Sequence, residues 1–397
     1  MNIKKAIAKL HLWFGLASGL VVFVVAITGC LLVFQEELKD IFYHDWRFVS
    51  KENKAESEVL PSVLFKNVRE VLPRQELKTL YFGQSKDPNR SLLFWAYDPA
   101  IENYYGIYVN QYNGDVIKIF EWKNNFKDDF FGRIDDLHTT LWMGKIGRDV
   151  IGISTIFFVV LLISGLILWW PKNRKSTGQR LWFKWKGTTK WRRKNYDLHN
   201  VFGFYSLIFS LLIALTGLVM AYNWMRDAVY FVASGGAPKT EHTDFSSLLD
   251  DYNQMEAMQT LDLIYSKFRI ENPEIEQFTV HEPTLDPNPV EIVASDKNYV
   301  RSDEFHFHPL TGELVEIEQF KDKNLGEKIL RLNYPIHSGL ILGLPGKILA
   351  FFASLVAASL PITGFYIWWG RRKKATKNRP SSKGIGQNKN SISKPVI

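Results

Sequence analysis

Four long apolar segments without a charged residue constrain this chain more than any other feature. They are residues 12–34, 150–170, 201–221 and 348–369, with 21 to 23 residues each. Such a length crosses a hydrocarbon core of about 30 Å at about 1.5 Å per residue. The first segment is too long for a secretory signal, and Gln35-Glu36-Glu37 follows it where a cleavage site would stand. The sequence therefore predicts four retained transmembrane helices.

The composition excludes several other classes of protein. Hydrophobic residues make up 46% of the 397 residues, which excludes a disordered chain. A single cysteine excludes a disulfide scaffold, an iron–sulfur cluster and a zinc ribbon. Charged residues make up 23%, which is too many for a chain that lies wholly in lipid. We therefore expect substantial parts outside the membrane.

The charges predict how the chain is oriented. Residues 1–11, 171–197 and 370–397 together carry 22 Lys or Arg and one acid, Asp197. The rest of the chain carries 27 basic and 40 acidic residues. Positive segments stay in the cytoplasm, so both termini and the middle loop are predicted there and the two long segments outside. The basic residues then face membrane lipid, and no nucleic-acid partner is expected.

The two halves of the chain share landmarks at two fixed offsets. The aligned pairs are His11 and His199, Gly15 and Gly203, Thr28-Gly29 and Thr216-Gly217, His138 and His337, Ser164-Gly165 and Thr363-Gly364, and Trp169-Trp170 and Trp368-Trp369. Both copies run in the same direction through the membrane. The sequence thus predicts two parallel repeats, related by a two-fold axis along the membrane normal.

The long segments, residues 36–136 and 223–335, are predicted to form two small α+β modules. Helical periodicity covers residues 60–71 and 247–268. Short aromatic and β-branched runs predict antiparallel strands at residues 77–82, 91–97, 105–112, 116–122, 278–281, 290–294, 304–308 and 314–320. Asn113-Gly114 and Thr311-Gly312 mark matching hairpin turns.

Four of the nine histidines are preserved in the repeat, and these are the candidate site residues. His11 and His199 begin the first and third spans, and His138 and His337 precede the second and fourth. A two-fold axis would give two facing imidazoles at each level, which is the ligand set of six-coordinate haem iron in a helical bundle. Polar anchoring at the membrane surface is the alternative.

Residues near these histidines are predicted to shape the haem sites. Gly15 and Gly203 are expected to leave space for a flat macrocycle, and Phe14 and Phe202 to pack on it. The helix before the second span is expected to break near Gly144, so that His138 folds back over the membrane. The same is expected of His337. Asp135 and Asp136 are candidates to orient His138.

This layout resembles the PepSY-associated transmembrane family, which includes iron-regulated inner-membrane proteins and ferric-siderophore reductases. The resemblance rests on four features, which are His11-x-x-Phe-Gly15, Leu137-His138, Ile336-His337 and the basic exits after both Trp-Trp pairs. It implies PepSY-like modules in the periplasm and haem b bound by membrane histidines. With one haem for each facing pair, His11 with His199 and His138 with His337, two haems are expected, although the sequence alone does not fix their number. It also implies electron transfer across the bacterial inner membrane to ferric chelates. A flavin reductase domain is fused to some relatives, but the cytoplasmic segments here are too short for one, so the electron donor is expected to be a separate flavoprotein or a quinol.

The predicted fold class is thus an α-helical integral membrane protein with two extracytoplasmic α+β modules. Its segments are a first span (1–35), a first module (36–136), an outer histidine segment with the second span (137–171), a cytoplasmic loop (172–197), a third span (198–222), a second module (223–335), a second outer histidine segment with the fourth span (336–370) and a disordered tail (371–397). The sequence leaves open whether the protein is an enzyme, and whether it forms a homo- or hetero-oligomer.

Two alternative functions remain beside ferric reduction. The first is a metal or siderophore transporter whose histidines are transient ligands. The second is a non-enzymatic anchor whose modules bind a peptide or protease. His306 and His308, at alternate positions of a predicted strand, are a further candidate contact for an iron chelate or a divalent ion.

Overall fold

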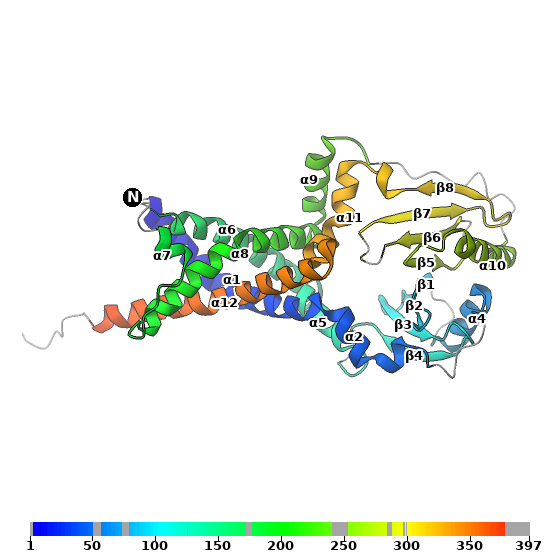
Figure 1. Ribbon diagram of the computed structural model, residues 1–397, viewed down its shortest axis with the longest axis horizontal. Coiled ribbons are helices and arrows are strands. Elements are labelled where there is room, and N and C mark those ends of the chain that lie inside the picture. Colours follow the sequence, from blue (N-terminus) through cyan, green and yellow to red (C-terminus); the bar gives the residue numbers. More distant parts are fainter. Residues whose placement is uncertain are drawn as a thin grey trace, which may run out of the picture.

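The computed structural model describes residues 3–50, 57–73, 79–124, 126–171, 177–239, 253–283, 288–296, 298 and 300–377. It has two parts, a bundle of long helices and an eight-stranded sheet at one end of that bundle (Figure 1). We call the end of the bundle next to the sheet the sheet end and the opposite end, which carries the N-terminus, the terminal end. We call residues 3–171 the first half of the chain and residues 177–377 the second half.

Four helices form the bundle. They are α1 (Ile3–Val33), α6 (Gly144–Trp169), α8 (Trp191–Ala221) and α12 (Gly343–Lys377). Each contains a stretch that is long and apolar enough to cross a membrane, so the four predicted spans are confirmed. The helices extend beyond the apolar segments, since polar residues continue a helix outside lipid. The predicted disorder of the tail is wrong for residues 371–377, which are helical, and residues 378–397 lie outside the described residues.

The helices are arranged so that α1 and α8 lie diagonally across the bundle. Helix α1 packs against α6 and α12, and α8 packs against the same two helices. Small side chains allow close packing between them, and Gly19 of α1 lies against Pro361 of α12. Residues on the inner faces of α1 and α8 can therefore meet at the centre.

Short helices join the bundle to the sheet. They are α2 (Gln35–Phe42), α3 (His44–Arg47), α5 (Phe130–Thr140), α9 (Asn223–Ser234) and α11 (Leu325–Ser338), while α7 (Thr177–Leu181) lies at the terminal end. Caps fix where two of them begin. The side chain of Asp129 accepts from the Gly132 amide before α5, and Asn324 and Glu327 form a capping box before α11.

The sheet joins strands from both halves of the chain in the antiparallel order β4-β3-β2-β1-β5-β6-β7-β8. Its strands are β1 (Thr79–Ser85), β2 (Leu92–Asp98), β3 (Asn103–Val109), β4 (Val116–Glu121), β5 (Gln277–His281), β6 (Val290–Ser295), β7 (Ser302–Phe307) and β8 (Leu314–Glu318). The sequence predicted these strands to within a few residues, but as two separate modules. The structure corrects that division, because β1 pairs with β5 and places Phe82 opposite Val280.

Helices α4 (Pro61–Val71) and α10 (Gln254–Glu271) cover one face of the sheet. Alternate strand residues face them, as the burial of β2 shows, and together they form one hydrophobic core. Its members include Leu64, Phe65, Phe82, Phe94, Leu261, Val280 and Ile292. Arg69 of α4 forms an ion pair with Glu282 from the second half. The predicted helix at residues 60–71 is confirmed, and of the second predicted helix residues 247–252 lie outside the described residues.

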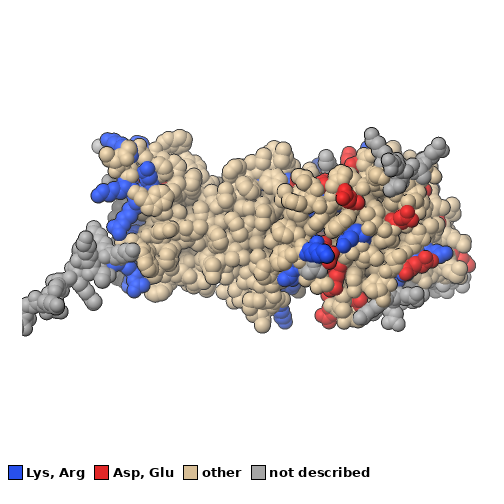
Figure 2. Space-filling view, turned by 90° about the horizontal axis from the view of Figure 1, so that it is seen from below, with Lys and Arg blue, Asp and Glu red and all other residues tan. Residues whose placement is uncertain are grey.

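Charged side chains are unevenly distributed along the long axis of the molecule. Figure 2 shows Lys and Arg side chains gathered at the terminal end and a wide band without charges over the bundle. On the face seen in this view, the visible acidic side chains lie towards the sheet end of the molecule. An uncharged band between two charged ends is the surface expected of a protein that spans a membrane.

Candidate functional site

The structure brings the four repeated histidines together as two facing pairs. His11 of α1 and His199 of α8 have ring centres 6.5 Å apart, with the ring planes at 86°. His138 of α5 and His337 of α11 have ring centres 6.3 Å apart, at 67°. We call them the terminal-end pair and the sheet-end pair. Each pair takes one histidine from each half of the chain, as the sequence predicted.

His138 and His337 reach the bundle because the chain reverses after each of them. Helix α5 ends at Leu141, whose φ is 52°, and α6 begins at Gly144, whose φ is 55°. Helix α11 ends at Gly339, with φ 82°. These left-handed residues reverse the chain between each short helix and the following span. His138 then contacts Thr28 of α1 and His337 contacts Thr216 of α8, so the expected fold-back of both histidines over the membrane helices is confirmed.

Two glycines allow this reversal to be tight. A Cβ atom at Gly147 of α6 would overlap the carbonyl oxygen of Thr140, at the end of α5. A Cβ atom at Gly346 of α12 would overlap the carbonyl oxygen of Gly339. No side chain fits at either position, so the start of each span can lie directly against the helix that carries the histidine.

All four histidines use the same ring nitrogen to contact a neighbouring helix. The Nδ1 atom lies at hydrogen-bond distance from a Ser or Thr hydroxyl in each case. The contacts are His11 to Ser164 at 2.8 Å, His199 to Thr363 at 2.8 Å, His138 to Thr28 at 3.0 Å and His337 to Thr216 at 3.0 Å. The Nε2 atoms form no hydrogen bond among the described residues, so Nε2 is the nitrogen left for a ligand.

The residue after each of these hydroxyls is a glycine, and the imidazole lies against it. A Cβ atom built on that glycine would stand 3.3 to 3.4 Å from the Cε1 atom of the ring. The contacts are Gly165 with His11, Gly364 with His199, Gly29 with His138 and Gly217 with His337. We call each combination a Ser/Thr-Gly dipeptide. The hydroxyl of the dipeptide contacts Nδ1 of the imidazole, and the glycine leaves room for the imidazole ring.

Every histidine and its Ser/Thr-Gly dipeptide come from the same half of the chain. His11 contacts α6 and His138 contacts α1, both in the first half. His199 contacts α12 and His337 contacts α8, both in the second half. In the sequence, these dipeptides stand out only as landmarks aligned between the two halves. Their recurrence in all four spans was the signal that could have revealed their role.

The expectation that Asp135 and Asp136 orient His138 is wrong. Asp135 bonds to Lys123, and Asp136 bonds to Arg133 and Thr140, so the hydrogen-bond partners of His138 are Thr28 and the Val25 carbonyl instead. Gly15 and Gly203 each face one leucine side chain of the adjacent helix, at van der Waals distance. Leu161 lies 3.8 Å from a Cβ position at Gly15, and Leu360 lies 3.5 Å from one at Gly203.

The two phenylalanines also pack within the protein. Phe14 stacks on Phe157 of α6, with ring centres 4.3 Å apart. Phe202 packs edge-on against Phe183 at 5.5 Å. Phe14 and Phe202 therefore contribute to contacts between segments of the chain.

The spacing of the paired rings fits one metal ion held between them. A metal–imidazole bond is about 2.0 to 2.1 Å long, and the ring centre lies about 1.1 Å behind the nitrogen, so two imidazoles on opposite sides of one ion have centres about 6.3 Å apart. The observed separations are 6.5 and 6.3 Å. Both pairs of rings thus lie at a separation that would allow one ion to bind between them.

The number of ligands indicates which kind of metal group fits. Among the described residues, Glu304, His306 and Glu318 form the one group of three or more His, Cys, Asp or Glu side chains close enough to share an ion. Within the described part of the chain, neither histidine pair therefore has a third such ligand close by. Zinc and copper sites usually take three or four protein ligands. Two opposed histidines fit haem, whose macrocycle supplies the other four ligand atoms.

A family comparison agrees with this layout. The profile described as the PepSY-associated TM region matches residues 8–371. The chain belongs to the PepSY-associated transmembrane family. The resemblance noted in the sequence is thereby confirmed, and the matched region includes both histidine pairs and all four Ser/Thr-Gly dipeptides of this PepSY-associated protein. Among curated proteins, none matches the chain significantly.

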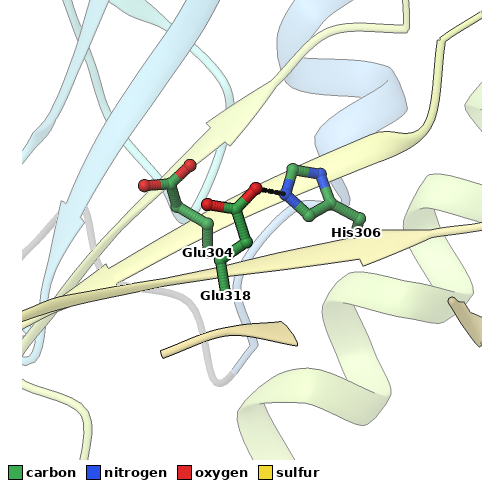
Figure 3. A group of neighbouring side chains, drawn as sticks. All are labelled: Glu304, His306 and Glu318. Atoms are coloured by element: carbon green, nitrogen blue, oxygen red, sulfur yellow. Dashed lines mark ion pairs between the residues drawn. The ribbon is translucent and has the colours of Figure 1, made fainter. Parts of the chain in front are cut away.

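The group formed by Glu304, His306 and Glu318 lies away from the histidine pairs, on the sheet of the PepSY-associated protein (Figure 3). His306 Nε2 lies 3.8 Å from Glu318, and Lys323 Nζ lies 2.9 Å from the same carboxylate. Arg331 forms an ion pair with Glu304. Two cations thus balance the two carboxylates, and the group is an ion-pair cluster.

The remaining histidines have other surroundings. His308 follows β7, and its Nδ1 atom accepts from the amides of Leu310 and Thr311 in the hairpin turn, so it does not join His306 in one site. His44 is exposed at the surface, and His281 stacks on Tyr81 across the β1–β5 pairing at 5.0 Å. His242 lies outside the described residues.

Proposed function

We propose that this PepSY-associated protein binds two haem b groups, one between His11 and His199 and one between His138 and His337. The observation that supports this most strongly is the equal spacing of the two pairs, at 6.5 and 6.3 Å between ring centres. The Nδ1 atom of each imidazole is bound to a hydroxyl, which leaves Nε2 for the metal. The haems, when bound, supply one-electron chemistry.

The two sites lie at different depths of the membrane. Thr28, which contacts His138, follows His11 by 17 positions on the same helix, which is about 25 Å at 1.5 Å per residue. One haem cannot be ligated at both depths. The pairs are therefore two separate haem sites, through which an electron passes in turn as it crosses the bilayer. The surrounding apolar helices exclude water from both sites.

We infer the direction from the charges. The basic terminal end lies in the bacterial cytoplasm, and the sheet, with the acidic residues, lies in the periplasm (Figure 2). The two halves are parallel repeats, and their strands are PepSY-like modules that have fused into one sheet. A separate flavoprotein or a membrane quinol delivers electrons at the terminal-end pair.

The acceptor is a ferric chelate outside the membrane, of the siderophore type. One electron converts Fe(III) to Fe(II), which binds hard oxygen ligands more weakly, so the chelate releases its iron. A transporter would have to move the chelate itself through the bundle. An anchor would not need two facing imidazole pairs.

Reconstituted vesicles test this function. Purified protein is inserted into liposomes that enclose a membrane-impermeant reductant, and a ferric trihydroxamate with a ferrous-iron indicator is added outside. We expect ferrous iron to appear outside with the wild-type protein and to be absent with His199→Ala. Haem-loaded wild-type vesicles that pass electrons to no ferric chelate would contradict the proposal. Iron that enters the vesicles unreduced would favour the transporter.

A further inference from the structure

Each of the four hydroxyls that contact the histidines donates its proton in a hydrogen bond to a backbone carbonyl. Each donates to a carbonyl oxygen of its own helix, three or four residues earlier. The distances are 2.8 Å from Thr28 to Val24, 3.2 Å from Ser164 to Leu161, 2.8 Å from Thr216 to Leu212 and 3.0 Å from Thr363 to Ser359. A hydroxyl has one proton and two lone pairs. Towards the histidine, each can therefore only accept.

The histidine must then donate from Nδ1. A neutral imidazole has one N–H group, so a proton on Nδ1 leaves Nε2 with its lone pair. The sheet-end pair has a further acceptor in the same direction. The Val25 carbonyl lies 2.9 Å from Nδ1 of His138, and the Ile213 carbonyl lies 3.0 Å from Nδ1 of His337. Carbonyls only accept, so they require the same tautomer.

We propose that Thr28, Ser164, Thr216 and Thr363 are positioning residues that fix the four imidazoles in the Nδ1–H tautomer and leave the Nε2 lone pair free to bind a metal. The glycine that follows each hydroxyl completes the arrangement, because the ring lies flush against the helix there at 3.3 to 3.4 Å. Each half of the chain thus sets the protonation and direction of its own two ligands. The two ligands of one metal are then brought together when the two halves of the chain pack against each other.

The consequence for haem rests on the proposed function. An Nδ1–H group that donates to an acceptor makes the imidazole a stronger donor to the metal, and the loss of such a partner typically weakens metal binding about 10- to 100-fold. A stronger imidazole donor favours Fe(III). At the terminal-end pair, where the hydroxyl is the hydrogen-bond partner of Nδ1, removing the hydroxyl of Thr363 should therefore raise the reduction potential of that haem and leave the sheet-end haem unchanged.

The tautomers can be read without haem. The full-length protein is labelled with ¹⁵N-histidine, placed in lipid nanodiscs free of haem and examined by nitrogen NMR. We expect four half-buried imidazoles protonated on Nδ1, identified one at a time by His→Gln substitution. Thr363→Val, which keeps the shape and removes the hydroxyl, should release His199 from this state, and Thr363→Ser should restore it. Wild-type imidazoles protonated on Nε2 would overturn the proposal.

The haem-loaded protein gives the second readout, with Thr155→Val as the matched control. Thr155 also lies in a span and donates to its own helix, to the Ile151 carbonyl at 2.8 Å, but contacts none of the four histidines. Thr363→Val should raise the terminal-end potential and lower haem retention about 10- to 100-fold, while Thr155→Val should change neither. A folded Thr363→Val protein with wild-type potentials and retention would refute the positioning role. Correct tautomers in a wild-type protein that binds no haem would refute the proposed function alone.

Discussion

His11 and Ser164 are 153 positions apart in the sequence, and the Nδ1 atom of one lies 2.8 Å from the Oγ atom of the other. The contact joins α1 and α6 within the first half of the chain. The second half has the same contact between His199 and Thr363, also at 2.8 Å. Each half therefore holds its histidines in place by itself, and the two histidine pairs form where the halves meet.

A substitution in one histidine pair should remove only the haem at that pair. His199→Ala should remove one haem, at the terminal end, and leave the sheet-end haem with an unchanged spectrum, and His337→Ala should do the reverse. The reason is the separation of about 25 Å along α1, which prevents any shared ligand. Haem content and redox titration of each purified variant measure this. His44→Gln and His281→Gln serve as controls, and loss of both haems in either single alanine variant would show that the sites are coupled.

The glycines behind the rings should be as sensitive as the histidines. Gly364→Leu would place a side chain where the His199 ring lies, since even a Cβ atom would stand only 3.4 Å from Cε1. We expect loss of the terminal-end haem and retention of the sheet-end haem, with the four helices still inserted. Gly187→Leu is the control, because nothing lies within 4 Å of a Cβ atom there. A Gly364→Leu variant with both haems at full occupancy would speak against the proposed binding geometry.

The orientation of the chain can be tested with cysteine labelling. Cys30, the one cysteine in the sequence, is buried in α1 and is replaced by alanine. In that background, Asn113→Cys near the sheet should react with a membrane-impermeant thiol reagent in intact cells. Gly187→Cys, at the terminal end, should react only after the cells are broken. The reverse pattern would invert the proposed topology.

The sheet should lose stability in mild acid because of His281. Burial lowers the pKa of His281, and the nearby Glu291 carboxylate opposes this effect. The unfolded chain binds a proton below about pH 6.5, while the folded sheet does not, so the stabilisation is complete above that pH and falls as the pH drops below it, by at most about 1.4 kcal/mol per pH unit. Thermal unfolding at pH 7.5 and 5.5 should show a smaller loss for His281→Gln than for wild type. An equal loss in both would exclude this histidine as the cause.

Much of the site could be predicted from local patterns. The absence of charge over 21 or more residues identified the spans, because the bilayer sets their length. The alignment of His11 with His199 and of His138 with His337 identified the pairs, since a duplicated chain tends to place equivalent residues around one axis. Gly144 and Gly343, both with positive φ, marked the reversals that bring two of the histidines back to the bundle.

Contacts between segments far apart in sequence could not be predicted in this way. The pairing of β1 with β5 depends on how two strand edges meet, which the alternation within a strand does not specify. The contact of Gly15 of α1 with Leu161 of α6 depends on how two helices pack, which the pattern within one helix does not specify. Asp135 was chosen as a partner of His138 because it is close in sequence, whereas the actual partner, Thr28, lies on another helix.

The most direct test of the account is the haem content of the purified wild-type protein after expression with ample haem. A pyridine haemochrome assay gives haem per chain, and the visible and electron paramagnetic resonance spectra give the ligation. The account predicts two haem b groups per chain, both low-spin with two histidine ligands. A correctly folded, four-span protein that contains no haem would contradict it.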